Sequence, residues 1–136
     1  SEMCIRDRIY GWGNELSRKW ANFGSSECCE GAIGGADQWL NTAPVGSLLP
    51  NDFGFYDMFG NVWEWMADWQ GVYGSRHSSH SRGVESGLGR VARGGSWLNF
   101  PRVLRASARL YFSPSGQTSN VGIRCAKDAA VVLTAE

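Results

Sequence analysis

Glycine interrupts this sequence so often that few long regular elements are expected. The chain of 136 residues contains 18 Gly, and seven Trp are distributed among them. Glycine permits tight turns and close approach of backbone segments, whereas tryptophan buries a large apolar area and carries an N–H that needs an acceptor. Apolar residues make up 43% of the chain, which is enough for one core. The sequence therefore predicts a single loop-rich domain built around aromatic anchors.

The regular elements that the sequence predicts are short. In residues 61–69, Trp63 and Trp65 flank Glu64, which is the alternation of a strand with an inward aromatic face. Residues 14–23 are expected to form a turn or a short helix. Three further segments alternate like strands: residues 90–95, 105–112 and 121–127. Two stretches have the composition of loops: residues 24–60 and 70–89. The expected fold class is α+β, with a small, mainly antiparallel sheet.

Charge is divided unevenly along a chain whose formal net charge is zero. Residues 1–85 contain eleven acidic and six basic side chains, whereas residues 86–127 contain seven basic and no acidic ones. Nearly all the basic residues are arginine, which favours planar, bidentate pairing over the mixed Lys/Arg surface of a nucleic-acid-binding protein. We therefore expect the acidic and basic parts to dock on each other, and we expect no nucleic-acid partner. No apolar run is long enough to cross a membrane.

One cluster of oxygen-bearing groups indicates a hard cation. Asp57 and Glu64 supply carboxylates, and the turn between them frees the carbonyls of Gly60 and Val62. Two carboxylates and two carbonyls suit Ca²⁺ far better than zinc, although the order of acids is not that of an EF-hand. The alternative is that ordinary turn and cap hydrogen bonds use these groups.

Five blocks of the chain resemble the formylglycine-generating enzyme, or sulfatase-modifying factor, family. They are "YGWGNE" (10–15), "TAPVGSLLPNDFGFYDMFGNVWEWMADW" (42–69), "RVARGGSW" (90–97), "RASAR" (105–109) and "VGIR" (121–124). The resemblance implies a variant of the C-type lectin fold. It also implies that residues 9–127 are the C-terminal part of that domain, with its N-terminal half missing. Residues 1–8, "SEMCIRDR", resemble a translated sequencing adapter and are expected to be a non-native leader; residues 128–136 are expected to be a tail.

The resemblance further implies two structural Ca²⁺ ions. The first would be held by the groups named above, the side chains of Asp57 and Glu64 and the carbonyls of Gly60 and Val62. The second would be held by two side chains, Asn22 and Asp37, and two carbonyls, Phe23 and Trp39.

The same comparison argues against copper. Formylglycine-generating enzymes bind copper through two cysteines shortly after the "RGGS" turn, and two thiolates form a soft site that selects Cu(I). In this chain the first position is Asn99 and the second falls near Pro101, so neither supplies a thiolate. Cys125 resembles a family cysteine outside the copper pair. We therefore expect no copper and no formylglycine-generating oxidase activity.

The function expected from the resemblance is that of a calcium-stabilised ligand-binding or accessory domain, a group that includes the variable proteins diversified by retroelements. Its partner would be a protein or a small molecule. Two alternatives stay open: an active oxidase acting on a sulfatase cysteine, and a fragment of an ergothioneine-type sulfoxide synthase. The expected ligand-binding residues are Leu98, Asn99, Phe100, Val103, Tyr111, Phe112 and Gln117. The expected framework residues are Arg93, Gly94, Gly95, Trp97, Arg105, Arg109 and Arg124. The compartment is not determined by these residues.

Overall fold

A four-stranded sheet and long irregular segments make up the computed structural model, which describes residues 8–24, 39–72 and 84–126. The strands are β1 (Trp63–Trp69), β2 (Arg90–Arg93), β3 (Leu110–Phe112) and β4 (Val121–Gly122). One 3₁₀ helix, η1 (Pro101–Leu104), lies between β2 and β3, and the described ranges contain no α-helix. Within those ranges, no helix has the length and apolar character that crossing a bilayer requires.

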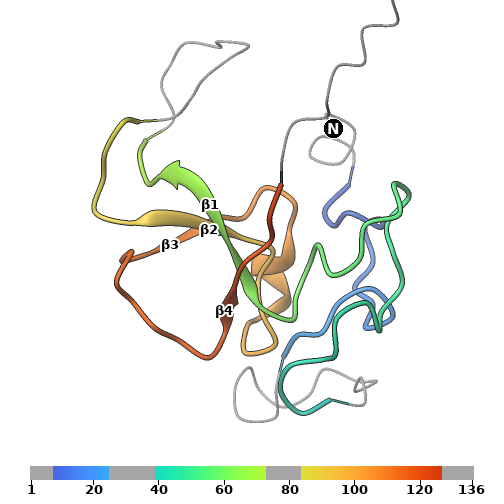
Figure 1. Cartoon of the computed structure of the whole chain (residues 1–136). Coiled ribbons are helices and arrows are strands. Elements are labelled where there is room, and N and C mark those ends of the chain that lie inside the picture. The colour runs from blue at the N-terminus through green and yellow to red at the C-terminus, as the bar shows by residue number, and fades with distance from the viewer. Residues whose placement is uncertain (1–7, 25–38, 73–83, 127–136) are drawn as a thin grey trace, which may run out of the picture.

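The sheet is mixed, with the strand order β3-β2-β1-β4. β2 pairs antiparallel with both β1 and β3, whereas β4 pairs parallel with β1. Figure 1 shows the sheet on one side of the molecule and the irregular segments 8–24 and 39–62 on the other. The prediction of a small sheet in a loop-rich domain is confirmed. Its antiparallel character holds for β1, β2 and β3 but not for the edge strand β4.

Aromatic packing explains why β1 forms where the alternation predicted it. Trp63 is 1% exposed. The ring of Phe112, on β3, meets Trp63 and Trp65 edge-on, at centroid distances of 6.4 and 5.8 Å. Such edge-to-face contacts add to the area that the rings bury. The inward aromatic face of β1 is therefore confirmed.

The predicted strand over 90–95 is two residues too long. β2 ends at Arg93 because Gly94 and Gly95 take φ values of 94° and 79°, which a strand does not allow. A Cβ on Gly95 would lie 2.6 Å from Cδ2 of Leu104, so this turn also needs glycine for the close approach of η1. The Gly-Gly pair thus ends the strand and brings η1 against it.

The predicted strand over 105–112 is confirmed only at its end, residues 110–112. Arg93 takes the carbonyls that a ladder would need: Nη2 donates to the Ala106 carbonyl at 2.6 Å and Nη1 to that of Ala108 at 2.9 Å. Ala108 N–H also donates back to the Arg105 carbonyl at 2.9 Å, which forms a turn. Likewise, of the expected strand over 121–127, only Val121–Gly122 pairs in the sheet.

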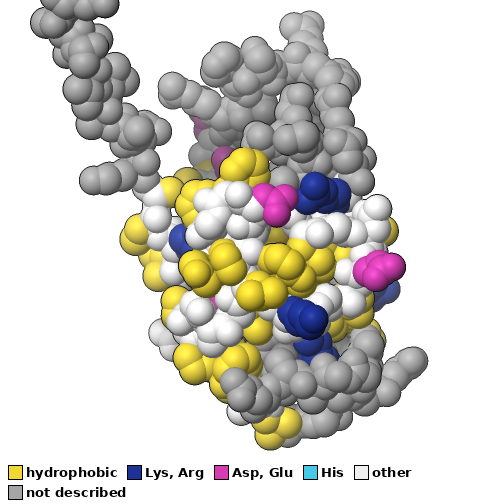
Figure 2. Space-filling model, turned by 90° about the vertical axis from the view of Figure 1, so that its right-hand side faces the viewer, with side chains coloured by type: hydrophobic (Ala, Val, Ile, Leu, Met, Phe, Trp, Pro, Cys, Tyr) yellow, Lys and Arg dark blue, Asp and Glu magenta, His cyan; other side chains and the backbone are white. Residues whose placement is uncertain are grey.

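The irregular side has an apolar cluster of its own. Residues 14–23 contain a turn and no helix, so the turn is the alternative that holds. Tyr10, Ala21, Phe23 and Leu104 are buried together, and the Tyr10 and Trp12 rings stack at 5.1 Å. Figure 2 shows that apolar side chains also lie on the surface of this side. Its exposed large apolar residues include Leu40, Val45, Leu49, Phe53, Phe55 and Tyr56.

Candidate cation site and the Asn99 region

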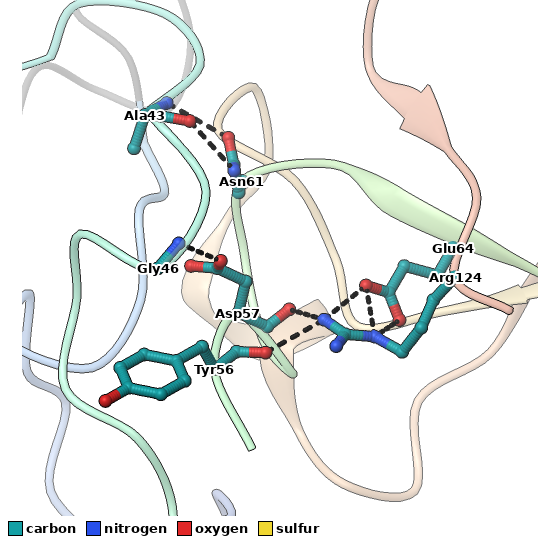
Figure 3. A network of polar contacts seen from close by, with 7 residues as sticks. All are labelled: Ala43, Gly46, Tyr56, Asp57, Asn61, Glu64 and Arg124. Carbon is teal, nitrogen blue, oxygen red and sulfur yellow. Dashed lines mark hydrogen bonds and ion pairs between the residues drawn. The ribbon is translucent and has the colours of Figure 1, made fainter. Parts of the chain in front are cut away.

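The first predicted cation set lies in the turn that leads into β1. Asp57, Gly60 and Asn61 all have positive φ, at 54°, 72° and 62°. Asn61 is buried, and its amide pairs with the backbone of Ala43, accepting at 3.0 Å and donating at 3.1 Å (Figure 3). Sequence reasoning did not identify Asn61. The tolerance of asparagine for positive φ, next to a glycine, was the available signal.

The two carboxylates of this set are held by different partners. Oδ2 of Asp57 accepts a hydrogen bond from the Gly46 N–H at 2.7 Å, while Oδ1 is buried and has no partner. Both oxygens of Glu64 accept from Nε of Arg124, at 2.8 and 2.9 Å. Figure 3 shows the Asp57 carboxylate directed toward Gly46 and the Glu64 carboxylate directed toward Arg124. The set therefore contains one acceptor oxygen that lacks a donor.

Arg124 is an internal cation at this turn. Its Nη2 lies 2.7 Å from Oε1 of Glu64 and donates to the carbonyls of Tyr56 and Asp57, at 2.8 and 3.1 Å. The hydrogen bond to Glu64 raises the pKa of the Arg124 guanidinium, although partial burial opposes this. One side chain near the C-terminal end of the described chain thus joins β1 to the preceding turn.

The second predicted cation set is only partly within the described residues, because Asp37 lies outside them. Asn22 is 2% exposed, and its Nδ2 donates to the Asn41 carbonyl at 2.7 Å. The carbonyl of Phe23 accepts from Nη1 of Arg18 at 2.6 Å, and Trp39 is half-buried. Across the described ranges, no three His, Cys, Asp or Glu side chains gather as a metal-binding group.

Asn99, at the position where the resemblance places a copper thiolate, is tied into the protein. Its Oδ1 accepts from Nε1 of Trp63 at 2.7 Å and from Oγ of Ser96 at 2.6 Å. Its backbone N–H donates to the Ser96 carbonyl at 3.0 Å, and its own carbonyl accepts from the Gly24 N–H at 3.1 Å. Asn99 therefore connects η1 and the Gly-Gly turn to β1 and to the irregular side.

These contacts close into a ring of hydrogen bonds. Nδ2 of Asn120 donates to Oγ of Ser96 at 3.2 Å, and the backbone N–H of Trp63 donates to the Asn120 carbonyl at 2.8 Å. We call Trp63, Ser96, Asn99 and Asn120 the Asn99 ring. Ser96 is fully buried, so its hydroxyl is a structural group here. Sequence reasoning missed Ser96 and Asn120 as members, because nothing in their spacing links them to Trp63.

Comparison with known proteins identifies the family. The sequence profile described as "Sulfatase-modifying factor enzyme 1-like domain" matches residues 4–129. The chain belongs to this family. It is 35% identical over 130 residues to the formylglycine-generating enzyme of Mus musculus, which covers 91% of this chain and 35% of the mouse protein.

Two solved structures resemble this family domain. Treponema denticola variable protein 1 has a TM-score of 0.68 at 29% identity, over 89% of this chain and 41% of that one. PvdO from Pseudomonas aeruginosa has a TM-score of 0.66 at 27% identity, over 90% of this chain and 47% of that one. The domain thus spans about a third to a half of the length of the relatives it matches.

The ligand-binding residues expected in this sulfatase-modifying-factor domain differ in exposure. Phe100 and Tyr111 are 45% and 52% exposed, and Gln117 is also exposed. The guanidinium of Arg102 lies over the Phe100 ring, 5.4 Å from its centroid. The remaining four are partly buried, namely Leu98, Asn99, Val103 and Phe112. Phe112 packs beneath β1, so the structure does not place the whole set on one exposed patch.

The framework residues expected in the family domain contact backbone more than acidic side chains. Arg93 binds carbonyls of residues 106–108, Arg109 donates to the Gly71 carbonyl at 2.6 Å, and Arg105 donates to the Arg102 carbonyl at 2.8 Å. Trp97 N–H donates to the Asn61 carbonyl at 2.9 Å, while its indole nitrogen is buried without a partner. Acidic and basic parts do meet at Arg124 and Glu64. Cys125 is a free, exposed thiol.

Proposed function

We propose that this domain is a ligand-binding or accessory member of the sulfatase-modifying-factor family and does not carry the copper-dependent oxidase activity. The observation that carries the proposal is the side chain of Asn99. Its amide oxygen is engaged by Trp63 and Ser96, at the position that the resemblance assigns to a thiolate. Cu(I) selects soft sulfur ligands, and an engaged amide oxygen is a poor substitute. Pro101, near the second position, offers no side-chain donor atom.

Surface chemistry beside this position supports binding. Phe100 is exposed and lies under the Arg102 guanidinium, and Tyr111 is exposed on β3. Aromatic and small polar side chains on a firm scaffold are typical of adaptable binding surfaces. The likeness to a protein named as variable supports the same interpretation. We also propose the C-type-lectin-like arrangement for this fold, which is in keeping with its small mixed sheet and long loops.

We further propose a structural Ca²⁺ ion at the turn before β1. Asp57 and Glu64 would hold it by side chain, and Gly60 and Val62 by carbonyl. The buried, partnerless Oδ1 of Asp57 supports this assignment, because such an acceptor is costly unless a donor or a cation reaches it. Glu64 would have to share its carboxylate with Arg124. The ion would cross-link the turn to the start of β1. The second set, which includes Asp37, stays a prediction.

An oxygen-consumption assay tests the first proposal. The full chain would be supplied with copper and a cysteine-containing sulfatase peptide, with the mouse formylglycine-generating enzyme as the positive control. We expect no oxygen uptake above that of peptide and copper alone. Conversion of the peptide cysteine to formylglycine, measured by mass spectrometry, would establish the oxidase alternative instead.

Thermal unfolding with Ca²⁺ and with EGTA tests the second. An ion that binds only the folded state raises the melting temperature. Asp57→Asn keeps an acceptor for the Gly46 N–H and removes a charge, so it should reduce the shift. Equal melting temperatures of the wild-type chain in Ca²⁺ and in EGTA would remove the calcium proposal.

A further inference from the structure

We propose that Asn99 presents its amide nitrogen as a fixed hydrogen-bond donor to a carbonyl or carboxylate oxygen of the ligand. The inference rests on the proposed binding function and specifies the chemistry of that site. It gives Asn99 two roles at that site. The same residue closes an internal ring through its oxygen and serves recognition through its nitrogen.

The orientation of the Asn99 amide follows from its partners. An indole N–H is a donor only, so the Asn99 atom that faces Nε1 of Trp63 at 2.7 Å must be the oxygen. Oγ of Ser96, which accepts from Asn120, has its own proton left to donate to that oxygen at 2.6 Å. The usual ambiguity between the amide oxygen and nitrogen is therefore resolved. Nδ2 of Asn99 must lie on the side of the amide group away from these two donors.

The amide nitrogen of Asn99, on a half-buried side chain, is left without a partner among the described residues. Within the described ranges, the hydrogen bonds of the Asn99 side chain all involve Oδ1, and none involves Nδ2. The partnerless buried side-chain atoms of the same ranges are Oδ1 of Asp57 and Nε1 of Trp97, and Nδ2 of Asn99 is not among them. Nδ2 of Asn99 is therefore neither hydrogen-bonded nor among the fully buried atoms of these ranges, and its two N–H groups are left to donate to a ligand.

The donor is also held still. Four hydrogen bonds fix Asn99, two through Oδ1 and two through its backbone N–H and carbonyl. They come from separate segments, at Trp63, Ser96 and Gly24. A group that is immobile before binding loses little conformational entropy when a ligand arrives. An exposed amide on a free loop would not have this advantage.

The surroundings define the ligand group. An amide N–H₂ pairs only with an acceptor, so the ligand must bring an oxygen. The next residue, Phe100, offers an exposed ring, and Arg102 holds a guanidinium over that ring. The segment that carries Asn99, Phe100 and Arg102, residues 86–127, contains no acidic side chain. An oxygen acceptor attached to an aromatic group fits this combination, whether it is a carboxylate or a neutral amide.

The decisive variant is Asn99→Asp in the full chain. Asp keeps the shape and one oxygen for Trp63 and Ser96, but it replaces the outward donor with a second oxygen. The probes are benzoate, benzamide and benzylammonium, titrated while the side-chain amide signals of Asn99 are followed by NMR. We expect benzoate or benzamide to shift those signals in the wild-type chain. Asn99→Asp should weaken that binding at least about tenfold, the effect of losing roughly 1.4 kcal/mol.

Several outcomes would overturn the inference, and one separates it from the proposed function. If neither benzoate nor benzamide shifts the Asn99 signals in the wild-type chain, the inference is wrong and no variant is needed to show it. Unchanged affinity in Asn99→Asp, or binding of benzylammonium alone, would end it as well. If Phe100→Ala abolishes benzoate binding while Asn99→Asp does not, the binding function stands and the role of Asn99 falls. Oxidase turnover would instead defeat the proposed function.

Discussion

Two positions in this domain resemble metal sites of the family, and they differ in the charge of the groups that lie there. At the turn before β1 the oxygen-bearing residues remain, and the Arg124 cation binds the Glu64 carboxylate. At Asn99, where the resemblance places a copper thiolate, the side chain is an uncharged amide held by neutral hydrogen bonds. The first position carries the charges that a cation needs. The second holds an uncharged network of hydrogen bonds.

In terms of the proposed function, the difference separates a turn whose groups suit a hard cation from a position whose groups do not suit Cu(I). Calcium and a guanidinium are both cations that carboxylates and carbonyls attract, so a turn can accommodate either without new side chains. A thiolate pair has no such stand-in, because amide groups neither carry its charge nor match its softness. We therefore predict that variants in the turn change stability through charge, whereas variants in the Asn99 ring change stability through lost hydrogen bonds.

The largest expected effect comes from Gly60→Ala. Gly60 has a φ of 72°, and a Cβ there would lie 2.2 Å from the carbonyl oxygen of Asn22. Strain and clash together should lower the free energy of unfolding by about 3 to 5 kcal/mol. Gly54→Ala is the matched control, because its φ is 80° with nothing within 4 Å of the added Cβ. Chemical denaturation measures both; equal losses would mean that the contact with Asn22 is unimportant.

Asn99→Ala should have the next largest effect. It leaves the buried indole N–H of Trp63 and the buried hydroxyl of Ser96 without their acceptor. The fixed indole N–H should cost about 1 to 3 kcal/mol without an acceptor, and the Ser96 hydroxyl less because its proton can rotate, so we expect a total loss of about 2 to 3 kcal/mol in unfolding free energy. Asn99→Asp restores the acceptor and should recover most of that loss. If both variants are equally unstable, the ring does not stabilise the fold through this oxygen.

The sequence predicted the elements whose causes are local. Alternating tryptophans located β1, and the pattern of β2 was correct as far as Arg93. The errors arose where distant contacts decide the backbone. The Arg93 guanidinium takes carbonyls of residues 106–108, which alternate well enough to have been assigned to a strand. The alternation within that segment gives no sign that an arginine from β2 binds its carbonyls.

The sequence could predict those parts of the candidate site whose chemistry depends on residue type alone. Acidic residues spaced along a turn indicate possible cation ligands, and an asparagine at the position where the resemblance places a thiolate argues against copper. The Asn99 ring could not be found this way, because Ser96 and Asn120 are common polar residues that meet Trp63 only after the sheet has formed. Likewise, the engagement of Glu64 by Arg124 joins residues 60 positions apart.

The smallest expected effect, Arg124→Gln, tests the electrostatic half of the comparison. The pair is partly exposed, with side-chain exposures of 35% for Arg124 and 13% for Glu64, so solvent weakens it. In EGTA we expect a loss of about 1 to 2 kcal/mol in unfolding free energy, because the carbonyls of Tyr56 and Asp57 also lose a donor. Arg105→Gln, on an exposed arginine, should change it by less than about 0.5 kcal/mol.

Repeating the Arg124→Gln measurement with saturating Ca²⁺ distinguishes the two cations. An ion bound by Asp57 and Glu64 would neutralise the carboxylate that the variant leaves without its guanidinium, so the difference from the wild-type chain should shrink. The variant should also show a larger rise in melting temperature with Ca²⁺ than the wild-type chain, because Glu64 no longer has to be shared. If the difference is the same in Ca²⁺ and in EGTA, calcium does not reach Glu64, and Arg124 is the cation of this turn.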